Sequence, residues 1–72
     1  MKEKIVEIMK RVFQVETLPE NPSQANVEPW DSLRHLNLII ELEMEFDTEF
    51  EPEQIAQMKS LQEIETVLSS QK

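Results

Sequence analysis

The sequence contains no glycine and no cysteine. Without glycine, the chain lacks the usual residue for phosphate-cradling loops, type I′ hairpin turns and glycine-capped helices. Without cysteine, it has no disulfide, no thiolate nucleophile and no thiolate metal site. The chain is instead rich in Glu, Leu, Gln, Lys and Met, which favour helices and argue against a β-sandwich. The composition therefore predicts an all-α protein.

Basic residues and long apolar runs are also scarce. The chain has fifteen Asp and Glu and only seven Lys and Arg, for a formal charge of −8. Such a surface repels nucleic acid and anionic membranes and favours partners with basic surfaces. The longest apolar run, residues 38–40, is far short of the roughly 20 residues that span a bilayer. Residues 1–10 carry acids within their apolar pattern and lack the features of a secretory signal. We expect a cytoplasmic protein without membrane insertion or nucleic-acid partners.

The length limits what the chain can do. Its 72 residues predict one domain, residues 1–72. A core of this size rarely supplies more than about 3–5 kcal/mol of net stability, which leaves little room for a preorganised catalytic pocket. The length therefore favours a binding, carrier or scaffold module over an enzyme, and we expect it to be a monomer.

A first helix and a long loop are predicted in the N-terminal half. Residues 2–15 are predicted to be helical because apolar side chains recur at helical spacing, at Ile5, Ile8, Met9, Val12 and Phe13. Glu7 precedes Arg11 by one turn, the orientation in which an ion pair adds about 0.2–0.5 kcal/mol to a helix. Residues 16–31 hold three of the four prolines and no helical period, so we expect a loop, ordered by its apolar anchors Leu18, Val27 and Trp30.

Three further helices are predicted over residues 32–46, 52–58 and 60–70. Residues 41–50 alternate acidic and apolar residues, as a strand would, but Leu, Met and Glu are weak strand formers and no second strand is available. Pro52 suits the first turn of a short helix with Ile55, Ala56 and Met58 facing inward. Residues 60–63 form a capping box for a last helix that buries Leu61, Ile64, Val67 and Leu68. The expected fold is a small four-helix bundle with a long first loop and a short third helix.

The second predicted helix has apolar residues on two faces. One face consists of Leu38, Ile39, Leu42 and Phe46, and the other, named the outer stripe here, consists of Leu33, Leu36, Ile40 and Met44. A helix that is apolar on two faces needs a second neighbour. The outer stripe is either covered by the short third helix or is a docking surface for other proteins, with Glu41 and Glu43 at its rim.

Two capping residues stand side by side where this helix begins. If Asp31 is the N-cap, its carboxylate accepts hydrogen bonds from the amides of the first turn. Ser32 then occupies the first helical position with its hydroxyl directed away from the core. The N-terminus of a helix stabilises anions, so a phosphate esterified to Ser32 would be held there at little cost. Alternatively, Ser32 is an ordinary residue of the first turn.

Residues 30–39, WDSLRHLNLI, followed by ELEMEFDTEFEPEQI and a fourth helix, resemble the acyl carrier protein family. The resemblance extends from the first helix to Leu68, and the family's Asp-Ser-Leu motif corresponds to Asp31, Ser32 and Leu33. It implies that Ser32 carries 4′-phosphopantetheine through a phosphodiester, installed from coenzyme A by a magnesium-dependent phosphopantetheinyl transferase. The thiol of this arm would hold an acyl or aminoacyl group as a thioester. A chain without cysteine would thus import its reactive sulfur.

The resemblance also implies that acyl-loading and acyl-processing enzymes contact the second helix, through basic docking surfaces. By position, the contacting residues beside Leu33 would be Arg34, Leu36, Asn37, Ile40, Glu41, Glu43 and Met44. Arg34 stands where carriers of fatty acid synthesis usually have an acid, and Asn37 where they usually have a glutamate. A cation is also slightly unfavourable at the N-terminus of a helix. These departures favour a dedicated polyketide, peptide or lipid pathway over fatty acid synthesis.

Parts of the sequence resemble three other kinds of protein. Asp31, Ser32 and His35 do not form a plausible catalytic triad, because an exposed first turn lacks an orienting third group, an oxyanion hole and a pocket. The acids of residues 47–53 lack the glycine that a calcium-binding EF-hand loop requires. We therefore expect no catalytic residues and no metal site. The remaining rival is an acidic helical adaptor that is never modified and docks through the outer stripe, for which Ser32→Ala would be silent.

Overall fold

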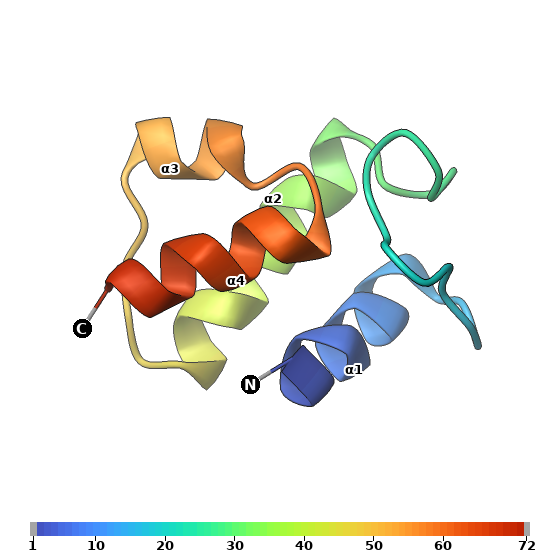
Figure 1. Ribbon diagram of the computed structural model, residues 1–72, viewed down its shortest axis with the longest axis horizontal. Helices are drawn as coiled ribbons and strands as arrows, with labels where there is room; N and C mark the ends of the chain where they lie inside the picture. Colours follow the sequence, from blue (N-terminus) through green and yellow to red (C-terminus); the bar gives the residue numbers. More distant parts are fainter. Residues whose placement is uncertain (1, 72) are drawn as a thin grey trace.

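The computed structural model describes residues 2–71 and contains four helices, α1 (Lys2–Phe13), α2 (Ser32–Glu45), α3 (Pro52–Gln57) and α4 (Leu61–Ser70) (Figure 1). The predicted all-α fold, with its long first loop and short third helix, is confirmed. Within residues 2–71 the β pairing is limited to an isolated bridge between Ser23 and Ser60. No helix in this range is both long and apolar enough to cross a membrane.

The ends of α1 and α2 show how helices terminate in a chain without glycine. Gln14, after α1, has φ 57°, and Asp47, after α2, has φ 50°. The residue after each one donates back to the helix, Val15 N to the Lys10 carbonyl and Thr48 N to the Glu43 carbonyl, both at 3.1 Å. This is the Schellman arrangement, normally built on glycine because a left-handed residue with a side chain costs roughly 1–2 kcal/mol. It ends α1 at Phe13, two residues earlier than predicted.

The core lies where α1 packs against α2 and α4, and α3 also packs against α4. It includes the predicted inner residues of α1, α2 and α4 except Val12 and Phe46, which are half-buried and pack against its edge. In α3 the prediction is partly wrong, because Ala56 is exposed and Ile55 is only half-buried. The six residues of α3 contribute no fully buried side chain. Met58, the residue that caps α3, is fully buried in their place.

The long loop is ordered, as predicted, because it is anchored by apolar side chains and by backbone hydrogen bonds. Val27 and Trp30 are buried and Leu18 packs half-buried against the core. The start of α4 fastens the loop, since Leu61 N donates to the Pro22 carbonyl and Gln24 N donates to the Lys59 carbonyl, both at 2.9 Å. The loop therefore delivers the start of α2 to a fixed place beside the bundle (Figure 1).

Side-chain hydrogen bonds cap the N-terminal ends of α3 and α4. Ser60 Oγ accepts from Glu63 N at 3.2 Å, which confirms Ser60 as the cap of α4. At α3 the side-chain oxygen of Gln54 accepts from Glu51 N at 2.9 Å. Each cap satisfies an amide that the helix itself cannot pair.

Candidate functional site

Asp31 caps α2 and Ser32 is its first residue, as the sequence predicts. Asp31 has an extended backbone, with φ −99° and ψ −175°. Its Oδ1 accepts from Arg34 N at 2.9 Å, and its carbonyl accepts from His35 N at 2.8 Å. Ser32 is exposed. Because the carboxylate of Asp31 is engaged with the first turn, its role is to shape the helix start.

The start of α2 suits an anionic group on Ser32. The first amides of a helix have no partner within the helix, and here these belong to Ser32 and Leu33. They lie at the positive end of the helix dipole, which favours a negative charge. A phosphodiester on the exposed hydroxyl of Ser32 would therefore be stabilised by the backbone beside it without displacing a buried group.

Trp30 and His35 fix this site between α1 and α3. The buried Trp30 packs its ring 5.2 Å from that of Phe13 and stacks on His35 with centroids 6.1 Å apart. Trp30 Nε1 donates to His35 Nδ1 at 3.0 Å. Since an indole N–H can only donate, Nδ1 is the unprotonated nitrogen of the imidazole. His35 Nε2 then carries the hydrogen and donates to the Ile55 carbonyl at 2.9 Å.

This arrangement gives the half-buried His35 a structural role. Its two ring nitrogens are engaged by Trp30 and by α3, so neither is directed to a proton of Ser32. His35 joins the end of the loop to α3 across the start of α2. The sequence carries no signal for this bridge, because Ile55 is 20 residues away.

Arg34 has a structural partner that the sequence does not reveal. Its side chain is half-buried, and Nη1 donates to the carbonyl of Phe13, the last residue of α1, at 2.9 Å. A cation is favourable at the C-terminal end of a helix. The contact with the end of α1 therefore explains why a cation stands at a position that α2 alone would disfavour. Arg34 therefore no longer supports a dedicated pathway. The exposed Asn37 has no structural explanation among the described contacts.

The outer stripe is exposed. Leu33, Leu36, Ile40 and Met44 retain 69%, 54%, 53% and 73% of their accessible surface, respectively. The alternative in which α3 covers these residues is wrong. The helix α3 packs against α4, and Leu38, Ile39 and Leu42 on the other face of α2 form its contact with the core.

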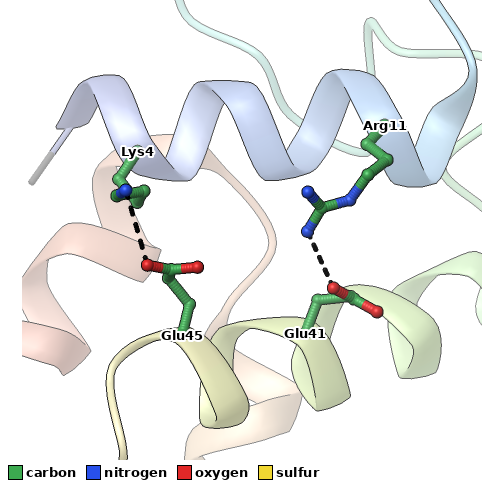
Figure 2. A network of polar contacts seen from close by, with 4 residues as sticks. All are labelled: Lys4, Arg11, Glu41 and Glu45. Atoms are coloured by element: carbon green, nitrogen blue, oxygen red, sulfur yellow. Dashed lines mark hydrogen bonds and ion pairs between the residues drawn. The ribbon is translucent and has the colours of Figure 1, made fainter.

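Glu41 at the rim of the outer stripe and Glu45, one turn further along α2, have partners within the fold. Arg11 Nη2 lies 2.8 Å from Glu41 Oε1, and Lys4 Nζ lies 3.5 Å from Glu45 Oε2, so two pairs connect α1 and α2 (Figure 2). Arg11 thus pairs with Glu41 in α2, not with Glu7 in its own helix.

Glu43 also has a partner within the fold. It is half-buried, and its Oε2 accepts from Phe50 N at 2.9 Å, which fastens the turn after α2.

Comparison with known proteins places the fold. No family model and no curated protein matches the chain. Among solved structures, one described as "a putative acyl carrier protein" from Mycobacterium tuberculosis matches with a TM-score of 0.83 and 24% identity. The match covers 96% of this chain and 95% of that one. The chain therefore has the fold of an acyl carrier protein, which confirms at the level of the fold the resemblance seen in residues 30–39.

Proposed function

We propose that this protein is an acyl carrier protein in which Ser32 holds a 4′-phosphopantetheine arm. The observation that carries the proposal is the exposed Ser32 at the first position of α2, directly after its cap Asp31, in a chain with this fold. Asp31, Ser32 and Leu33 match the family's motif residue for residue. The protein itself is the substrate of a phosphopantetheinyl transferase and has no catalytic residues of its own.

The residues around Ser32 fit this group. The Ser32 hydroxyl is the acceptor in the transfer and becomes the ester oxygen of the phosphodiester. The amides of Ser32 and Leu33 and the dipole of α2 stabilise the negative charge of that phosphodiester. Asp31 holds the first turn, and the Trp30–His35 bond holds the chain that enters it. When attached, the group supplies the thiol that this cysteine-free chain lacks, on which an acyl or aminoacyl group is held as a thioester.

The proposed carrier delivers its cargo to partner enzymes that dock on α2 beside Ser32. The exposed outer stripe supports this step, because it offers an apolar surface that the fold itself leaves uncovered. Of the two departures from the carriers of fatty acid synthesis, Asn37 remains without a structural reason. It supports a dedicated polyketide, peptide or lipid pathway over fatty acid synthesis. We propose that the protein acts as a cytoplasmic monomer.

The mass of the intact protein tests the proposal. The protein is incubated with coenzyme A, magnesium and a broad-specificity phosphopantetheinyl transferase that is active on another carrier in the same tube. We expect the wild type and Ser69→Ala, which removes an exposed serine of α4, to gain one phosphopantetheine group. Ser32→Ala is expected to gain nothing.

An unmodified adaptor that docks through the outer stripe is the second candidate, since it would show the same exposed face on α2. It predicts no mass gain on the wild type and an unchanged phenotype for Ser32→Ala in cells. The carrier predicts complete loss of function for that variant. The two candidates therefore give opposite results in both experiments.

A further inference from the structure

The acids of α2 lie along the two edges of the outer stripe. At about 100° per residue, Glu41 and Glu45 fall on one edge, one turn apart, and Glu43 falls on the opposite edge. The first edge faces α1, as Figure 2 shows. Each acid is therefore close enough to the outer stripe to influence a partner that docks there, and its own contacts decide what that partner meets.

Each acid on the edge beside α1 is paired with a cation of that helix. Arg11 contacts Glu41 and Lys4 contacts Glu45 (Figure 2). Both pairs are largely exposed, so their effect on stability is small. Their effect on a partner is different. A basic side chain approaching Glu41 or Glu45 meets Arg11 or Lys4 within a few Å, well inside the screening length of about 10 Å at 0.1 M salt. Repulsion by the cation offsets attraction by the acid.

The opposite edge gives a partner little access to a carboxylate. Glu43 is half-buried, and one of its oxygens is bonded to the Phe50 amide in the turn after α2. Recruiting that oxygen to a partner would leave the amide without its acceptor. The remaining acids of residues 41–53 lie between Asp47 and Glu53, beyond the C-terminal end of α2.

The outer stripe itself offers only apolar contact. Its four side chains, Leu33, Leu36, Ile40 and Met44, are each more than half exposed. The cation nearest to Ser32 in the sequence, Arg34, points its guanidinium to the Phe13 carbonyl. Around the outer stripe, the charged side chains are therefore paired with opposite charges or hydrogen-bonded within the fold. The apolar side chains stay exposed.

We infer that partner enzymes recognise α2 through an apolar recess that receives the outer stripe, and not through a basic patch. This inference rests on the proposed function and specifies the chemistry of the partner. It replaces the expectation of basic docking surfaces, which follows from the number of acids but not from their contacts. Docking then depends on the Leu and Met side chains and only weakly on salt.

The transferase used above serves as the probe, since it must dock beside Ser32 before modifying it. The kcat/KM of modification is measured by mass at about 0.05 M and about 0.5 M NaCl, where screening lengths differ about threefold. We expect the double variant Leu36→Ala/Met44→Ala to lose at least about tenfold at both salt concentrations. The matched charge variant Glu45→Gln is expected to stay within about twofold of the wild type.

Arg11→Gln sharpens the test, because it removes the cation from Glu41. This variant is expected to stay within about twofold of the wild type at both salt concentrations, because an apolar recess presents no cation to the freed Glu41. Circular dichroism before each assay confirms that every variant is folded, which we expect because all four positions are exposed.

Several results would overturn the inference. A loss of tenfold or more for Glu45→Gln, or for the wild type on raising the salt, would show that charge directs docking. An unchanged kcat/KM for the double variant would show that the outer stripe is not used. A dimer in sedimentation velocity that the double variant abolishes would make a second copy the occupant. In each case the wild type is still modified, whereas failure to modify it at all would remove the proposed function as well.

Discussion

The two faces of α2 carry the same kinds of residue and meet different environments. Leu38, Ile39 and Leu42 on the inner face are at most 3% exposed, whereas Leu36 and Ile40 on the outer stripe are more than half exposed. Burying such a side chain contributes about 1.5–3 kcal/mol, so the inner face is needed for folding. The outer stripe contributes little to folding, and an exposed apolar patch marks either an interaction surface or a risk of aggregation.

The difference between the faces means that the contribution of α2 to folding can be separated by mutation from its proposed role in docking. The inner face holds the bundle together, while the outer face is available to other proteins. At the start of α2, Arg34 and His35 connect the helix to α1 and α3. Four predictions test this division.

The largest effect is expected from truncating the inner face. Leu42→Ala should lower the free energy of unfolding by about 2–5 kcal/mol, which is comparable to the whole stability expected for so small a core. Leu36→Ala on the outer stripe should change it by less than about 0.5 kcal/mol. Urea denaturation followed by far-ultraviolet circular dichroism measures both. Equal losses for the two variants would contradict the division between the faces.

Removing the His35 bridge should come next. His35→Ala leaves the Trp30 indole N–H and the Ile55 carbonyl without their partners. We expect a loss of about 2 kcal/mol in the free energy of unfolding, because each unpaired group costs about 1–3 kcal/mol when buried and both hydrogen bonds of His35 are only partly buried. The exposed neighbour Asn37→Ala is the control for stability. Exchange of the Trp30 indole proton, followed by NMR, should accelerate in the His35 variant and stay slow in the control.

Arg34→Met should cost about 1 kcal/mol. The variant loses a charged hydrogen bond to the Phe13 carbonyl, and it also relieves an unfavourable cation at the start of α2, which returns part of the loss. Thermal denaturation of Arg34→Met and Arg34→Lys measures the balance. A variant as stable as the wild type would show that the contact with α1 does not hold the edge of α2.

Salt should have the smallest effect on stability. Residues 41–53 contain seven acids and no base, and the whole chain carries −8, so repulsion is strongest at low ionic strength near neutral pH. Added NaCl or magnesium should stabilise the fold by about 0.5 kcal/mol, a rise of about 2–4 °C in Tm. The two ion pairs between α1 and α2 weaken at the same time and limit the gain. A Tm that does not rise would contradict this prediction.

The sequence alone determined much of this protein, because many of its signals are local. Helical periodicity located the four helices and separated Leu38 and Leu42 from Leu36 and Ile40 on α2. The capping preference of Asp placed Asp31 directly before the helix. Ser32 is then the first residue of the helix. Each of these features depends on residues within a turn or two of one another, so a linear pattern contains it.

Only the tertiary structure decided which charged and polar groups are engaged. Arg34 bonds to a residue 21 positions away, Arg11 to one 30 positions away, and His35 to one 20 positions away. The sequence favoured Glu7 as the partner of Arg11 because Glu7 is near in the chain, but packing brought Glu41 closer to it. Whether an acid is available to a partner depends on such distant contacts. The number of acids could therefore be read from the sequence, whereas the chemistry of the proposed docking surface required the fold.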